Sequence, residues 1–253
     1  MLWRDVRGII LRTVPLVIFL MGWQVASYFT RPIILPSPTA AIGGLAQLAI
    51  RDELQFAILT TLTALSLGFA TAAIMGTFIG MLIGWFKKAH TALSPYVYAL
   101  GSSPSFVFIP IIILWFGIGF EARLVYVIFA SIIPVIINVM HGVRYIESEL
   151  IELAKSLGAS QLQMLRHIVL GGATTFLIAG LRLGLVRAFT ATILSEMFFR
   201  LEGVGGLLSK YSSVFRTPEI FGLIVVIISL SQVALGVIKL VERRLLKWKP
   251  QIT

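Results

Sequence analysis

The chain has 253 residues, of which 58% are hydrophobic and only 13% are charged, and its mean hydropathy is +0.95. A soluble domain of this length cannot bury so much apolar surface, so the composition indicates an integral membrane protein. The net charge of +10 would suggest nucleic-acid binding in a soluble protein. Here the basic residues sort by loop, and no nucleic-acid partner is expected.

Long, continuous apolar runs predict helices rather than the short alternating strands of a membrane β-barrel. Each run reaches or exceeds the ~20 residues that cross a bilayer. Six spans are expected, at residues 9–29, 55–86, 92–117, 122–142, 172–198 and 219–241. The expected fold class is all-α: a polytopic membrane protein whose six transmembrane helices form a single domain over residues 1–253.

Charge asymmetry orients these spans. With the N-terminus inside, fifteen Lys and Arg residues fall on or near the cytoplasmic side and six remain outside. This satisfies the positive-inside rule with both termini in the cytoplasm. Arg182 and Arg187, in the fifth span, are expected near the inner surface, where they can snorkel or pair with phosphate.

Between the first two spans, three prolines interrupt the start of residues 31–54, and residues 39–50 are expected to form a short interfacial helix on the outer face. The second span then carries a small residue at every fourth position. We call this row the small-residue ridge; it comprises Gly68, Ala72, Gly76, Gly80 and Gly84. Such a row lets another helix approach closely, and packing inside the bundle is favoured over a subunit interface.

The third span contains three prolines and a serine-rich patch at residues 101–105, and the fourth contains Pro134 and Asn138. Broken helices with polar groups at membrane depth are typical of a transport pathway. A kink that only improves packing is nearly as consistent with this pattern, because hydroxyls can bond their own backbone. The candidate pathway residues are Ser102, Ser103, Pro104, Phe106, Asn138 and Glu196.

Residues 144–170 form a polar, helix-forming stretch between the fourth and fifth spans, which we call the knob. It is predicted to fold as two short amphipathic helices, with Gly158 ending the first and Ser160 capping the second. Leu150, Leu153 and Leu157 would give the first helix an apolar side. The orientation of the spans places the knob in the cytoplasm, where it is available to a docking partner.

Chemistry for an energy source is missing. The chain has no Gly-Lys pair and hence no phosphate-binding P-loop, and its three histidines lack metal-ligand spacing. Glu196 is the only acidic residue well inside a span, so an acidic proton relay is absent as well. Energy is therefore expected from a partner. Two rival interpretations are a self-contained secondary carrier or channel and a membrane scaffold that transports nothing.

The knob resembles the EAA motif of bacterial ABC importer permeases, EAA-x3-G-x9-I-x-LP. Residues 152–158 read Glu-Leu-Ala-Lys-Ser-Leu-Gly and residues 168–170 read Ile-Val-Leu, while leucine replaces the second motif residue and Gly171 the final proline. Segments 35–38, 115–119, 180–183 and 242–248 extend the resemblance to the nitrate/sulfonate/taurine-type permeases.

This resemblance implies a MetI-like fold and a permease homodimer in the bacterial inner membrane, in contact with lipid. It also implies two copies of a separate ABC ATPase and an extracytoplasmic solute-binding protein. The chain itself would hold no cofactor, because ATP and Mg would bind the ATPase. The solute would be small and anionic. The residues expected to couple to the ATPase are Glu149, Glu152, Ala154, Lys155, Leu157, Gly158, Ile168 and Leu170.

Overall fold

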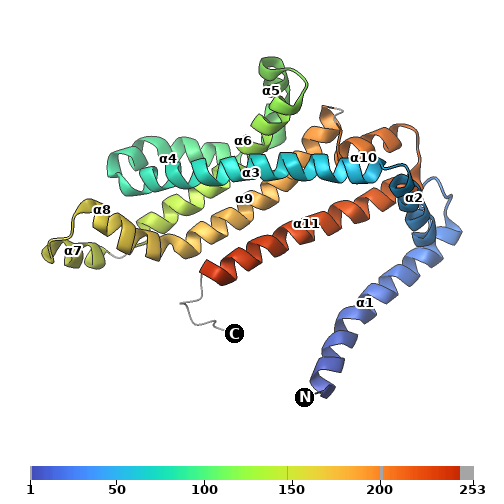
Figure 1. Ribbon diagram of the computed structural model, residues 1–253, viewed down its shortest axis with the longest axis horizontal. Coiled ribbons are helices and arrows are strands. Elements are labelled where there is room, and N and C mark those ends of the chain that lie inside the picture. The colour runs from blue at the N-terminus through green and yellow to red at the C-terminus, as the bar shows by residue number, and fades with distance from the viewer. Residues whose placement is uncertain (1, 147, 200–201, 246–253) are drawn as a thin grey trace.

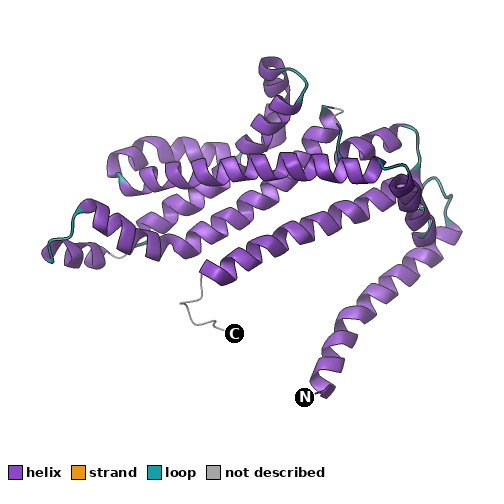
Figure 2. Ribbon diagram, viewed as in Figure 1, coloured by secondary structure: helices purple, strands orange, loops and turns teal. Residues whose placement is uncertain are grey.

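The computed structural model describes the backbone of residues 2–146, 148–199 and 202–245, a chain of helices joined by loops with no strand in those ranges (Figures 1 and 2). Its α-helices are α1 Leu2–Phe29, α2 Pro38–Ile50, α3 Glu53–Trp85, α4 Lys87–Ser102, α5 Ile109–Phe116, α6 Phe120–Arg144, α7 Ser148–Ser156, α8 Gln161–Met164, α9 Leu170–Phe198, α10 Val204–Ser213 and α11 Thr217–Leu245. A 3₁₀ turn, Ser105–Phe108, precedes α5, and a π-helical turn, Leu165–Val169, precedes α9.

The core is a row of three long helices, with α6 packed between α3 and α9. All five residues of the small-residue ridge on α3 are buried. They meet α6 so closely that a Cβ added at Gly80 would lie 2.9 Å from the carbonyl oxygen of Ile136, and one added at Gly84 would lie 2.7 Å from Cβ of Val143. The ridge therefore packs inside the bundle, as predicted.

The other side of α6 meets α9 in the same manner. A Cβ at Gly180 would lie 2.9 Å from that of Asn138, and one at Gly184 would lie 2.7 Å from a methyl group of Val135. Glycine on each helix removes the side chains that would otherwise hold the two backbones apart. Small residues thus allow the three helices to pack closely. We call α3, α6 and α9 the frame, because the functional segments are attached to them.

The two ends of this frame carry different structures. The knob, with α7 and α8, lies at one end, and α2 and α10 lie at the other, which we call the far end (Figure 1). The predicted helix at residues 39–50 is confirmed as α2, which begins where the hydroxyl of Ser37 accepts a hydrogen bond from the Ala40 amide at 3.2 Å. It packs on the start of α11, where Gly44 leaves room for the backbone of Pro218.

Four helices are long and apolar enough to span a membrane, namely α3, α6, α9 with the turn before it, and α11, and they match the expected second, fourth, fifth and sixth spans. The expected third span is divided. Its two parts, Lys87–Ser102 and Ser105–Phe116, meet at an angle of 96°. The part of the first span over Thr13–Phe29 is a shorter apolar helix, so the total of six spans remains a prediction.

Candidate functional site

The knob begins with α7, which ends in a sharp turn built on Gly158. This residue has φ of +77°, a conformation that side chains with a Cβ rarely adopt. Its amide donates to the Lys155 carbonyl at 3.0 Å, and the next amide, of Ala159, donates to the Ala154 carbonyl at 3.0 Å. This pair of bonds is the Schellman pattern that satisfies the last carbonyls of a helix. The glycine stop predicted from the sequence is confirmed.

Ser160 caps the second knob helix, again as predicted. Its hydroxyl accepts a hydrogen bond from the Gln163 amide at 3.3 Å, and the Gln163 side chain accepts one from the Ser160 amide at 2.8 Å. This reciprocal capping box satisfies two amides that a helix start leaves without a partner. The knob is consequently a folded element with defined ends rather than a loose loop.

One side of the knob packs against the frame and the other is uncovered. Ala154, Met164 and Val169 are buried. Leu150, Leu153 and Leu157 are exposed, the last of them to 79%, and they lie next to the exposed Glu152 and Lys155. Of the remaining expected coupling residues, Ile168 is half-buried and Leu170 is exposed, while the side chain of Glu149 lies outside the described residues.

A cavity of about 410 Å³ lies between the knob and the adjoining ends of α3, α4 and α6. Its polar lining includes Lys87, Arg144, Lys155 and Gln161, and no acidic residue is among the described side chains that line it. Basic residues thus gather where the knob joins the helices.

The break in the third span lies at Ser103 and Pro104. Proline has no amide hydrogen to continue the helix, and the hydroxyls of Ser102 and Ser103 turn back to carbonyls of the preceding turn, at 3.1 Å from Tyr98 and 2.9 Å from Ala99. The predicted break is therefore real, and its angle of 96° is much larger than a kink that only improves packing.

A cavity of about 130 Å³ opens behind this break, between α4, α6 and α9, and we call it the pathway cavity. Its polar lining is Ser103, Ser105, Asn138 and Arg187. The structure thus brings together two predicted pathway residues, Ser103 and Asn138, from separate spans. Ser102, Pro104 and Phe106 are exposed beside the break without lining the cavity.

Arg182 and Arg187 lie in different surroundings, although the sequence suggested a shared place near the inner surface. Arg182 forms an ion pair with Glu242 of α11. Arg187 lies five residues further along α9 and lines the pathway cavity. The break in the third span places its serines beside Arg187, and the expected position of both arginines near the inner surface stays a prediction.

Glu196 does not line the pathway cavity but is fully buried near the far end. The Thr61 hydroxyl lies 2.9 and 3.0 Å from its two carboxylate oxygens, the Gly205 amide donates to it at 2.9 Å, and the Arg123 guanidinium lies 3.4 Å away. Gly203 passes so close that a Cβ there would lie 2.2 Å from the carboxyl carbon. This cluster ties α3, α6 and α9 to the start of α10.

Sequence reasoning missed the partners of Glu196. The signal was present, because a carboxylate inside a span needs a cation or several donors. Arg123, at the start of the fourth span, was one of few basic residues on the same side of the membrane. Thr61 could not be singled out among the many threonines of the second span.

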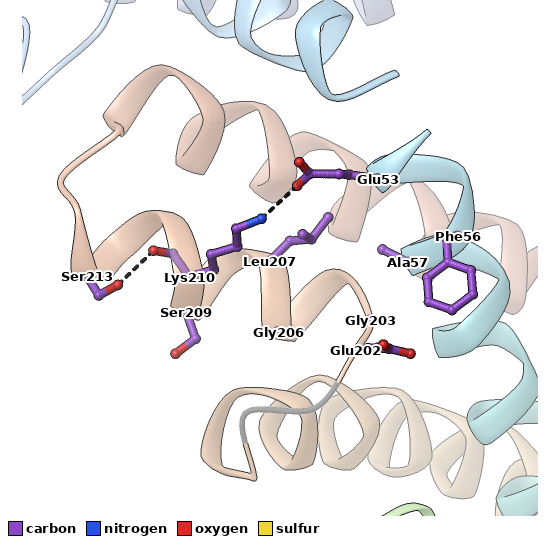
Figure 3. Close-up of a pocket in the computed structure, with 10 residues that line it drawn as sticks. All are labelled: Glu53, Phe56, Ala57, Glu202, Gly203, Gly206, Leu207, Ser209, Lys210 and Ser213. Atoms are coloured by element: carbon purple, nitrogen blue, oxygen red, sulfur yellow. Dashed lines mark hydrogen bonds and ion pairs between the residues drawn. The ribbon is translucent and has the colours of Figure 1, made fainter. Parts of the chain in front are cut away.

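A larger cavity, of about 640 Å³, opens at the far end between α3 and α10 (Figure 3). Lys210 reaches Glu53 at 3.0 Å beside it, and the Tyr211 hydroxyl donates to the same carboxylate at 3.0 Å. Burial, and then the bond to Glu53, raises the pKa of Tyr211 above its ordinary value, so the phenol stays a donor. These contacts hold α10 against the start of α3.

Helices of membrane-spanning length, a capped and exposed knob, and a polar break in one span are the features expected of a transport subunit. Residues 76–247, more than half of the chain, match the family described as binding-protein-dependent transport system inner membrane component. The chain belongs to this family and is its membrane-spanning permease.

Named relatives cover nearly the whole chain. The riboflavin transport system permease RibX of Chloroflexus aurantiacus is 30% identical, over 93% of this chain and 89% of its own. The putative aliphatic sulfonates permease SsuC of Bacillus subtilis is 26% identical over 96% and 87%, and the taurine permease TauC of Escherichia coli is 26% identical over 93% and 88%.

Among solved structures, a chain of the MetNI methionine ABC transporter in an inward-facing conformation superposes with a TM-score of 0.67. It is 18% identical and the match covers 78% of this chain and 98% of that one. At this identity the likeness shows the fold alone, and it confirms the MetI-like, all-α architecture.

Proposed function

We propose that this permease imports a small anionic solute, and that a separate ABC ATPase, docked on the knob, drives the transport. Two copies of the chain would form the pathway and two ATPase subunits would bind Mg-ATP. The chain itself would hold no nucleotide. An extracytoplasmic binding protein would deliver the solute at the far end, and both chain termini would face the cytoplasm.

The observation that carries this proposal is the exposed side of the knob. Short helices in water are marginal on their own, yet α7 and α8 are closed by a Schellman turn and a capping box, and their buried residues anchor them to the frame. Their leucine row remains uncovered beside Glu152 and Lys155. A rigid helix with an apolar row and flanking charges suits docking into a groove on another protein.

The choice of solute rests on the relatives and on the cavity. Two of the similar permeases are named for sulfonates or taurine and one for riboflavin. The pathway cavity carries one cationic side chain and no acidic one among its described lining residues, which supports an anion such as a sulfonate. Ser103 and Asn138 are proposed as pathway residues, with Glu196 supporting the helices around them.

The test reconstitutes the permease with the ATPase and binding protein encoded beside it, and measures ATP hydrolysis and solute uptake in proteoliposomes. Glu152→Lys and Gly158→Pro are expected to retain insertion and assembly of the permease, and to lose the coupling of ATP hydrolysis to uptake. Glu121→Lys reverses an exposed charge at the start of α6 and is the matched control for Glu152→Lys.

Full transport by both knob variants would refute the docking role of the knob. Uptake by the permease alone, without ATPase or ATP, would instead establish the rival function of a self-contained secondary carrier.

A further inference from the structure

Arg187 is a positively charged residue deep within a predicted span. The membrane-spanning helix runs over His167–Phe198, so Arg187 follows its start by 20 residues and precedes its end by 11. At 1.5 Å per residue these separations are about 30 Å and about 17 Å. Arg187 therefore lies in the interior of that helix, more than ten residues from either end, and its side chain is exposed on the single chain.

Two other arginines on the frame helices have carboxylate partners. Arg123 pairs with Glu196, and Arg182 pairs with Glu242. Arg187 forms no ion pair or hydrogen bond with the described part of the chain. An arginine within a membrane-spanning helix is costly to insert, so a position without an internal partner points to an external one.

The surroundings of Arg187 offer donors. Asn138 uses one amide hydrogen for the Pro134 carbonyl at 2.8 Å and has a second to give. Ser105 lies 3.5 Å from the Tyr126 hydroxyl, a long contact that leaves its hydrogen free to turn. The Ser103 hydroxyl already donates to Ala99 at 2.9 Å. A planar guanidinium beside neutral donors matches the oxygens of a sulfonate or similar oxyanion.

The size of the site is compatible with this chemistry. A cavity of about 130 Å³ is large enough to hold one oxyanion group. We propose that Arg187, with Asn138 and Ser105, forms an anion-binding station within the pathway, which holds the oxyanion group of the solute as it crosses. This inference rests on the proposed function and names the residue that selects its substrate class.

The first experiment probes Arg187 directly. The permease–ATPase complex in nanodiscs is treated with phenylglyoxal, which modifies accessible arginines, and the modification of Arg187 is followed by peptide mass spectrometry. Methanesulfonate is expected to slow this modification several-fold, whereas its uncharged analogue dimethyl sulfone leaves it unchanged. Asn138→Ala is expected to weaken the protection. Arg182, on the same helix but paired with Glu242, serves as the internal reference.

An Arg187 that is unreactive, or equally reactive with and without methanesulfonate, would overturn the inference. The first result would mean that the guanidinium does not face water, and the second that it binds no small oxyanion.

The second experiment measures ATP-driven uptake of the solute delivered by the cognate binding protein. A charge-assisted hydrogen bond contributes about 1.5–3 kcal/mol, so Arg187→Gln is expected to reduce uptake of an anion by about tenfold or more. Arg187→Lys should restore part of the loss, and both variants should keep ATPase assembly. Uptake equal to wild type in Arg187→Gln would refute the station while leaving the proposed function intact. Absence of ATP-driven uptake by the wild type, with protection of Arg187 retained, would refute the proposed function alone.

Discussion

Replacing Glu196 with alanine should destabilise the permease more than any surface change. Arg123 is only 3% exposed, and loss of the carboxylate would leave its charge buried without a partner. Removing one member of a buried ion pair typically costs about 3–5 kcal/mol. The Gly205 amide would also lose its acceptor, which adds about 1–3 kcal/mol for a buried donor. We expect a total loss of about 4–8 kcal/mol in the free energy of unfolding.

The assay is unfolding of the purified permease in mixed micelles with increasing sodium dodecyl sulfate, followed by tryptophan fluorescence. Glu53→Gln is the matched control, because its ion pair with Lys210 is partly open to solvent and should contribute no more than about 1 kcal/mol. The double variant Glu196→Gln with Arg123→Met removes both charges and keeps hydrogen-bonding capacity at residue 196. It should be more stable than Glu196→Ala.

Two results would refute this reasoning. A loss in Glu196→Ala no greater than that in Glu53→Gln would show that the buried cluster contributes little. Strictly additive effects of the changes at Glu196 and Arg123 would show that their charges are not coupled.

Two further predictions concern helix packing and pH. Gly80→Ala should lower the free energy of unfolding by about 1–3 kcal/mol, because the new methyl group meets a carbonyl of α6. Gly43→Ala, with open space around it, should be neutral or stabilising in the same unfolding assay. Equal effects of the two variants would contradict the close packing of α3 on α6. The raised pKa of Tyr211 means that the fold favours the protonated phenol, so its contribution is complete below the unfolded pKa of about 10 and is lost as pH rises through the folded pKa. The stability difference between wild type and Tyr211→Phe should therefore be constant from pH 7 to 9 and shrink at higher pH, and a difference that shrinks below pH 9 would contradict the bond to Glu53.

The span positions could be predicted because the length of an apolar run alone decides whether a helix crosses a bilayer. The fourth and fifth spans, expected at residues 122–142 and 172–198, are found at Phe120–Arg144 and Leu170–Phe198. The knob was equally readable, since Gly158 and Ser160 act through bonds to residues within five positions of them. Local chemistry of this kind is fully present in the sequence.

Features that depend on distant contacts were not readable. The prolines predicted a break in the third span but not its angle of 96°, nor the close approach of α6 at Gly101, where an added Cβ would lie 2.8 Å from Ile137. The role of Glu196 depends on Arg123, which is 73 residues away in the chain. The place of Arg187 beside Ser103 and Asn138 was not predicted, because the sequence does not state which residues of a neighbouring span lie at the same level.

The π-helical turn at Leu165–Val169 joins the knob to α9 and contains one residue more per turn than the α-helix that follows. Tightening this turn into a regular α-helix would rotate everything before it by one residue step, or about 100° around the helix axis. The extra residue in this turn therefore sets the direction in which the leucine row of the knob points. Deleting one residue from this turn should leave both knob helices folded but rotate them away from the surface of a docked partner. The orientation of the knob therefore depends on residues other than those that fold its helices.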